Sequence, residues 1–98
     1  MTDLPRIDSA ALAQLCAQYG IARLELFGSH ARGDASDDSD VDLLYELLPG
    51  QHLTWEIETL ETELTALFGR PVDLVSRHSL HPLIRPGVEA QTKALYAA

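Results

Sequence analysis

The chain has 98 residues, of which 46% are hydrophobic and 22% charged, values that are typical of one small globular domain. Its 15 Asp and Glu outnumber its 7 Lys and Arg, so the formal net charge is −8 at pH 7. Because polyphosphates and anionic membranes attract basic surfaces, this charge excludes unaided binding to nucleic acid or membrane and, at face value, disfavours any phosphate-bearing ligand.

The first half of the chain predicts one long helix and two strands. Apolar residues recur at three- and four-residue steps over residues 9–19, which indicates the helix. Residues 21–27 alternate between apolar and polar, as in a strand with one buried face, and Glu25 falls on the other face. Residues 29–32 are expected to form a short helical turn, and residues 41–48 a second, more apolar strand.

The second half predicts a long helix, a short strand and a final helix. Residues 52–68 carry an apolar stripe at helical spacing, with glutamates over much of the remaining surface. Residues 72–75 are expected to form the strand, and residues 88–96 the last helix, after the breakers Pro82 and Pro86. This alternation of elements predicts a two-layer α+β domain, in which helices pack on a small mixed β-sheet.

The sequence also indicates a cytoplasmic location. Charged residues such as Glu46 interrupt the apolar stretches before any is long enough to span a bilayer, and residues 1–10 lack the apolar run of a secretory signal. A single cysteine, Cys16, excludes an internal disulfide and suits a reducing compartment, and its place on the helix stripe predicts a core residue. We expect one domain over residues 1–98.

Three aspartates form the candidate metal site. Asp40 and Asp42 are two residues apart at the start of a strand, so both side chains project from the same face. Asp73 lies in the next predicted strand between two apolar residues, where a buried carboxylate is costly unless it is paired, protonated or bound to a metal. The alternative is that Asp73 faces water on an edge strand, which would be preferred without its two partner aspartates. If the two strands are neighbours, three carboxylates meet, and ligation by oxygen alone favours Mg²⁺ over Zn²⁺.

A candidate phosphate site precedes these aspartates, at the end of the first strand. Gly28 allows the backbone to approach a ligand closely, and a helical turn after Ser29 would offer free N–H groups to a phosphate. Carboxylate-held metal ions beside an anion site are the components of phosphoryl or nucleotidyl transfer, in which two ions activate the attacking oxygen and stabilise the leaving pyrophosphate.

The spacing of these residues resembles a known signature. Gly28-Ser29, ten further residues and Asp40-Val41-Asp42 closely resemble the motif of the DNA polymerase beta-like nucleotidyltransferase superfamily. The longer string GSHARGDASDDSDVDLLYEL is similar to the minimal nucleotidyltransferase (MNT) family of small stand-alone domains. The similarity covers most of the chain, from the helix before the glycine to a final helix that ends in Leu95-Tyr96.

The resemblance implies a role for each matching residue. The glycine–serine pair would hold the β- and γ-phosphates of ATP, and the two aspartates of the Asp-Val-Asp motif would ligate two Mg²⁺ ions. The aspartate of the later strand would join the ion that activates the acceptor hydroxyl, and the arginine would contact a phosphate or support the acidic loop. The glycine–serine pair is Gly28 and Ser29, and the aspartates of the Asp-Val-Asp motif are Asp40 and Asp42. The aspartate of the later strand is Asp73, and the arginine is Arg32.

The resemblance also implies a partner. Many members of the MNT family are antitoxins encoded beside a HEPN ribonuclease toxin, which implies ATP-dependent transfer of AMP to a tyrosine of such a toxin. Because 98 residues leave no room for an acceptor-binding domain, we expect the acceptor on another chain. Two bound Mg²⁺ ions would make the site locally positive, so that it attracts a triphosphate, and the remaining acidity would complement a basic partner.

Two other functions remain open at this point. One is an antitoxin that neutralises its toxin by binding alone, with silent carboxylates, although all three aspartates are intact. The other is nucleotidyl transfer to a small molecule such as an aminoglycoside, for which a homodimer would have to build the missing pocket.

Several residues outside the motifs have simpler interpretations. His78 and His81 are expected at the surface, since no further metal ligands accompany their three-residue spacing. His30 lies within the glycine–serine turn and is a candidate nucleotide contact. Trp55, near the start of the long helix, belongs either to the core or to an interface.

Overall fold

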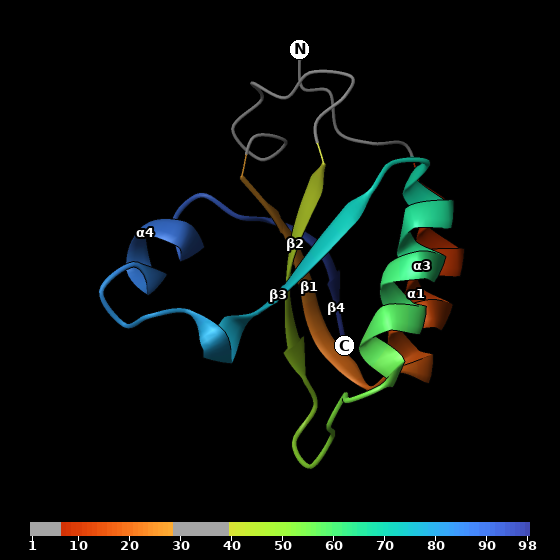
Figure 1. Cartoon of the computed structure of the whole chain (residues 1–98), viewed down its shortest axis with the longest axis horizontal. Coiled ribbons are helices and arrows are strands. Elements are labelled where there is room, and N and C mark those ends of the chain that lie inside the picture. Colours follow the sequence, from red (N-terminus) through yellow and green to blue (C-terminus); the bar gives the residue numbers. More distant parts are fainter. Residues whose placement is uncertain (1–6, 29–39) are drawn as a thin grey trace.

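The computed structural model describes residues 7–28 and 40–98. Helices α1 and α3 cover one face of a four-stranded sheet, and the short helix α4 lies on the other side (Figure 1). The elements in chain order are α1 (Ser9–Gln18), β1 (Ile21–Phe27), β2 (Val41–Leu47), α3 (Glu56–Phe68), β3 (Val72–Ser76), the 3-10 helix η1 (Arg77–Ser79), α4 (Arg85–Glu89) and β4 (Lys93–Ala97).

The sheet is mixed, as the sequence predicts. Its strands lie in the order β3-β2-β1-β4, with β1 antiparallel to both β2 and β4, and β2 parallel to β3. Helices on one face of such a sheet make a two-layer α+β fold, so the predicted fold class is confirmed. In the described part of the chain, no helix has both the length and the apolar character needed to cross a membrane.

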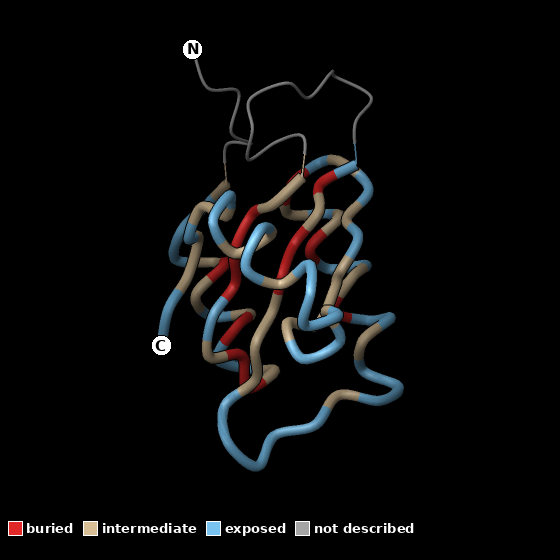
Figure 2. The backbone as a smooth tube through the Cα atoms, turned by 90° about the vertical axis from the view of Figure 1, so that its left-hand side faces the viewer, coloured by how far each residue is buried: buried red, intermediate tan, exposed pale blue. Residues whose placement is uncertain are grey.

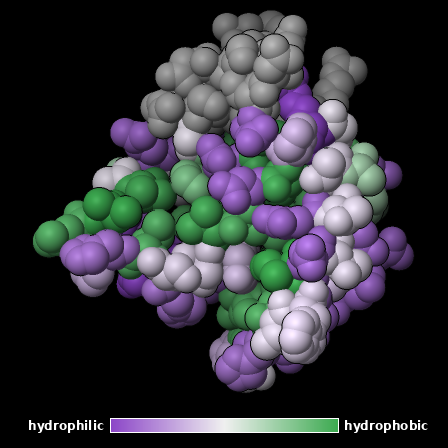
Figure 3. Space-filling model, viewed as in Figure 1, coloured by the Kyte–Doolittle hydropathy of each residue, from purple (hydrophilic) through white to green (hydrophobic). Residues whose placement is uncertain are grey.

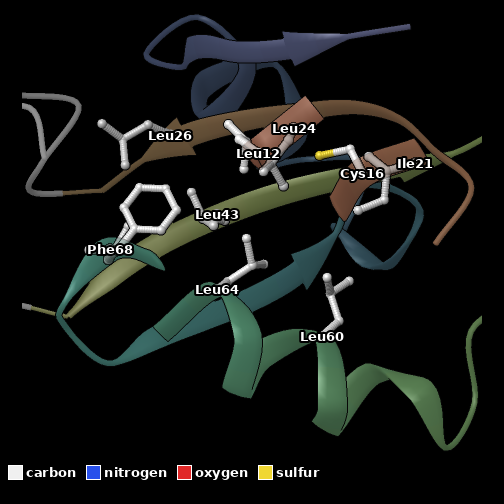
Figure 4. Close-up of a cluster of buried hydrophobic side chains, with 10 residues drawn as sticks. Leu12, Cys16, Ile21, Leu24, Leu26, Leu43, Leu60, Leu64 and Phe68 are labelled. Carbon is white, nitrogen blue, oxygen red and sulfur yellow. The ribbon is translucent and has the colours of Figure 1, made fainter. Parts of the chain in front are cut away.

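The hydrophobic core lies between the sheet and helices α1 and α3 (Figure 4). Burial follows the middle of the fold, along β1 and β2 and the inner sides of the two helices (Figure 2). Cys16 is fully buried there, as predicted. The core residues are Leu12, Cys16, Ile21, Leu24, Leu26, Val41, Leu43, Leu60, Leu64 and Phe68.

Local polar contacts set the ends of the two long helices. Asp8 caps α1, because its carboxylate accepts hydrogen bonds from the backbone N–H groups of Ala10 and Ala11 at 3.0 and 3.2 Å. Helix α3 begins at Glu56 rather than at residue 52, and the Glu56 carboxylate accepts a hydrogen bond from the Thr54 N–H at 3.0 Å. This bond stabilises the ionised carboxylate and lowers the pKa of Glu56.

The final predicted helix, over residues 88–96, is wrong. Only Arg85–Glu89 is helical, as α4, and Lys93–Ala97 forms the edge strand β4. The outer edge of β1 would otherwise leave unpaired backbone groups, and β4 satisfies them by antiparallel pairing. A short, alanine-rich segment has only a weak preference of its own, so this tertiary pairing decides its conformation.

Burial of the Cys16 thiol predicts a pH-dependent contribution to stability. Desolvation raises the pKa of Cys16 from 9.0 to about 11. Below about pH 9 both folded and unfolded chains hold the proton. Between about pH 9 and 11 only the folded chain holds it, so the free energy of unfolding falls by up to about 3 kcal/mol. Urea titrations across this range should show the fall in the native chain.

The control for this prediction is the Cys16→Ala variant. Its small cavity lowers stability by a constant amount at every pH, because alanine does not titrate. The fall above pH 9 should therefore be shallower in the variant by the contribution of the thiol. Equal pH dependence of the two chains would contradict a buried, protonated Cys16.

Candidate active site

Asp42 and Asp73 lie side by side on the sheet face opposite α1 and α3. Strands β2 and β3 are parallel neighbours, and their register pairs Asp42 with Asp73. The flanking residues Val41 and Leu43 are fully buried in the core, so strand alternation directs Asp42 to the other face. The condition set by the sequence, that the two aspartate strands are neighbours, is confirmed.

Helix α3 holds the edge strand β3 in place. The Thr65 hydroxyl accepts a hydrogen bond from the Val72 N–H, and the Glu61 carboxylate accepts one from the Leu74 N–H, both at 3.2 Å. Side chains of the helix thus satisfy backbone donors on either side of Asp73. These contacts fix the position of the Asp73 backbone relative to the neighbouring strand.

Asp73 is not buried between its apolar neighbours; it takes the other position that the sequence left open, on an edge strand facing water. Asp73 is exposed, because it lies on the outward face of an edge strand, while Val72 and Leu74 pack toward the core. Its carboxylate therefore carries no desolvation cost that a metal would have to offset. The support for Asp73 as a site residue comes from its register with Asp42 instead.

Gly28 packs against the carboxylate of Asp42. It follows β1, whose last residue, Phe27, pairs with Asp42 in the sheet. Its φ of 74° lies in the left-handed region that glycine adopts without a steric penalty. A Cβ at this position would clash with Asp42 Oδ2 and lie 3.2 Å from Asp42 Cγ. The absence of a side chain at residue 28 therefore creates the space that the carboxylate occupies.

The described residues fit a magnesium site in part. Asp40, the third aspartate, is exposed just before β2. Among residues 7–28 and 40–98, no group of three His, Cys, Asp or Glu side chains is arranged to hold a metal. Mg²⁺ in nucleotide sites is commonly held by one or two carboxylates, with substrate phosphates and water completing its shell. The adjacent Asp42 and Asp73 match that donor set.

Two of the candidate phosphate residues, Ser29 and Arg32, lie outside the described residues, as does His30. Their roles stay predictions. His78 and His81 are exposed, which confirms them as surface residues.

Sequence reasoning missed a buried ionic cluster on the same sheet face. Glu25, expected to face away from the core, is only 5% exposed. The Arg77 guanidinium forms ion pairs with Glu25, Glu46 and Glu89, and its Nε lies 3.3 Å from Glu46 Oε1. The Thr92 hydroxyl donates a hydrogen bond to Glu25 at 3.1 Å. These residues are far apart in the chain, so the sequence did not predict that they meet. The alternation of β1 predicted only the face of the strand on which Glu25 lies.

Two hollows in the described part of the chain lie away from the aspartates. One, of about 440 Å³, is lined by residues at the end of α1 and before α3, including Tyr19, His52 and Glu56. Another, of about 310 Å³, adjoins the turn after β2 and includes Tyr45 and His78. Neither of these two hollows is lined by Asp42 or Asp73.

Comparison with known proteins agrees with this geometry. A family model described as the nucleotidyltransferase domain matches residues 9–95. The protein adenylyltransferase MntA of Thermococcus cleftensis is 41% identical over 83 residues, which cover 82% of this chain and 83% of that protein.

Two solved structures are similar in fold. A minimal nucleotidyltransferase is 39% identical, with a TM-score of 0.72 over 86% of this chain and 85% of that one. A chain in the complex of tri-AMPylated Shewanella oneidensis HEPN toxin with MNT antitoxin is 20% identical. Its TM-score is 0.63 over 92% of this chain and 70% of that one, which shows a shared fold. The family match, the close relatives and the paired aspartates beside Gly28 together show that this chain belongs to the nucleotidyltransferase domain family.

Proposed function

We propose that this chain uses Mg²⁺ and ATP to transfer AMP to a tyrosine of a HEPN-type toxin, and so acts as the antitoxin of that toxin in the cytoplasm. The observation that carries the proposal is the register of Asp42 with Asp73 beside Gly28, on the face of the sheet that α1 and α3 leave uncovered. The names of the relatives, a protein adenylyltransferase and the AMPylated toxin complex, support the choice of acceptor.

The aspartates bind and orient the reactants in this proposal. Asp40 and Asp42 would hold Mg²⁺, and Asp73 would join them beside the acceptor hydroxyl. When bound there, the ion would offset the negative charge of the triphosphate and lower the pKa of the hydroxyl. The hydroxyl oxygen forms a bond to the α-phosphorus as the bond from that phosphorus to the bridging oxygen breaks. Pyrophosphate leaves, and a carboxylate oxygen of Asp73 accepts the hydroxyl proton.

The glycine–serine turn positions the leaving group. In the proposal, backbone N–H groups after Gly28 and the Ser29 hydroxyl bind the β- and γ-phosphates, and Arg32 contacts a phosphate. The left-handed conformation of Gly28 and its contact with Asp42 support this assignment, because they bring the start of the turn against the metal-binding carboxylate.

The test is transfer of AMP to a defined partner. The purified chain is incubated with ATP, Mg²⁺ and the HEPN-type protein encoded in the adjacent reading frame, and the partner is analysed by intact-mass spectrometry. We expect a mass increase by whole AMP units, loss of ribonuclease activity, and a modified tyrosine in the peptide map. Chelation of Mg²⁺ should prevent all three changes.

The Asp40→Asn/Asp42→Asn double variant separates the proposal from its alternatives. We expect it to add no AMP and to leave the toxin active. Full silencing of the toxin by this variant without a mass change would show neutralisation by binding alone. Modification of an aminoglycoside, with none of the toxin, would assign the activity to a small-molecule acceptor.

A further inference from the structure

A hydrophobic tip projects from the sheet face that carries the aspartates. The tip consists of residues 80–88, which lead into and include most of α4. Leu83 is 86% exposed and Ile84 is 54% exposed, and none of the α4 residues is buried. Figure 3 shows hydrophobic side chains gathered in this region, at the left of the view. Exposed apolar groups that cluster in this way mark interaction sites more often than isolated ones do.

The residues that flank the tip on either side anchor it to the sheet. At its start, Arg77 pairs with Glu25 of β1 and Glu46 of β2. At its end, Glu89 pairs with the same Arg77, and the Thr92 hydroxyl donates to Glu25 at 3.1 Å. Because Glu25 is 5% exposed, these contacts lie partly inside the fold and hold the segment against the sheet.

Hydrogen bonds within the tip also define its conformation. His81 accepts hydrogen bonds at Nδ1 from the Leu83 N–H, at 3.1 Å, and at its carbonyl oxygen from the Ile84 N–H, at 3.0 Å. The Arg85 guanidinium donates to the Leu80 carbonyl at 3.2 Å, which closes the turn. A segment that is fixed in this way presents its apolar side chains with little ordering cost on binding.

The tip and the candidate site share one side of the molecule. Asp42 alternates with core residues of β2, and Glu25 alternates with core residues of β1, so both point away from α1 and α3. Arg77, which begins the anchored segment, contacts Glu25 on that same side. A protein that brings a hydroxyl to Asp42 and Asp73 must approach the side of the sheet from which the tip also projects.

We propose that the tip is the docking surface for the protein that accepts AMP, and that Leu83 and Ile84 insert into an apolar socket on it. This inference rests on the proposed function for the identity of the acceptor. Residues 80–88 contain no Asp or Glu and one Arg, Arg85, so the contact that the tip offers is apolar rather than acidic. Docking at the tip, outside the reacting groups, holds the acceptor hydroxyl near the carboxylates and so raises its effective concentration there.

The test compares two exposed apolar positions. The Leu83→Ser/Ile84→Ser variant is expected to bind the HEPN-type protein of the adjacent reading frame at least about tenfold more weakly by calorimetry. It should raise KM for that protein and leave kcat unchanged at saturation. The control is Trp55→Ser. Trp55 is 88% exposed, which excludes the core position that the sequence left open. It immediately precedes α3, which covers the opposite face of the sheet, so an interface there would not involve the acceptor docked at the tip. We expect wild-type affinity and KM from this control variant.

Each other outcome has a defined meaning. Unchanged affinity of the Leu83→Ser/Ile84→Ser variant, or an equal loss with Trp55→Ser, would overturn the inference. A change only in sedimentation of the isolated chain, from dimer to monomer, would assign the tip to a second copy of this chain instead. If the wild-type chain binds through the tip but transfers no AMP, the proposed function fails and the docking surface stands.

Discussion

Replacing Asp42 by asparagine is expected to lower the rate of AMP transfer by about 10³-fold or more, equivalent to about 4 kcal/mol of transition-state stabilisation. Asparagine keeps the size of the side chain, so the contact with Gly28 and the pairing of β2 with β3 are preserved. It loses the negative charge with which Asp42 would hold Mg²⁺ in the proposed mechanism. Transfer kinetics with saturating ATP, together with Mn²⁺ binding followed by electron paramagnetic resonance, measure the two consequences separately.

Glu46→Gln is the matched control for this variant. Glu46 lies on the same strand and the same face, four residues farther along, and it contacts Arg77 instead of the aspartate pair. Its replacement removes an equal charge, so a general electrostatic effect would appear in both variants. We expect near wild-type metal binding from Glu46→Gln, and near wild-type kcat when the acceptor is saturating, because any loosening of the Arg77 contact would act on acceptor binding. Equal losses in both would argue against a specific ligand role for Asp42.

Gly28→Ala is expected to reduce both stability and activity. The left-handed backbone conformation costs an alanine about 1–2 kcal/mol, which lowers the free energy of unfolding. The new methyl group also clashes with the Asp42 carboxylate and forces it to move. A displacement of this kind at a catalytic group lowers the rate by about 10²-fold. Chemical denaturation and transfer kinetics measure the two effects.

Gly69→Ala separates these effects. Gly69 has nearly the same φ, 71°, in the cap of α3, and a Cβ there would meet no atom of the described residues within 4 Å. The backbone cost is therefore similar, without a contact to Asp42. We expect Gly69→Ala to lose comparable stability and retain full activity. If both alanine variants lost activity in parallel, the effect would be global destabilisation and the Gly28–Asp42 contact would have no special role.

Local sequence patterns predicted the elements that form from short-range order. The bounds of β1 agree with the alternating pattern over residues 21–27, and α3 ends at Phe68, before Gly69, as its stripe predicts. In each case neighbouring residues decide the conformation: a polar cap, a left-handed glycine, or a period that matches one buried face. The pairing of β4 with β1 depends on a partner about seventy residues away, and the helical spacing of residues 88–96 was misleading.

The candidate site also has some features that neighbouring residues determine and others that depend on distant parts of the chain. The sequence by itself predicts Gly28 and the Asp40-Val41-Asp42 motif as site residues from their spacing, because a short strand directs alternate side chains to one face. The sequence also determines the net negative charge of the chain, which a bound metal ion would reverse locally at the site. These conclusions need only the order of residues along the chain.

Tertiary structure alone decided which distant groups meet. The parallel register of β2 and β3 brings Asp73 beside Asp42, although Asp73 is exposed and the burial expected from its apolar neighbours does not occur. The fold likewise buries Glu25 against Arg77 and leaves Leu83 exposed. The physical reason is that residue periodicity tells which face of a strand a side chain occupies, but not which distant strand becomes its neighbour, and that choice depends on how the segments pack together.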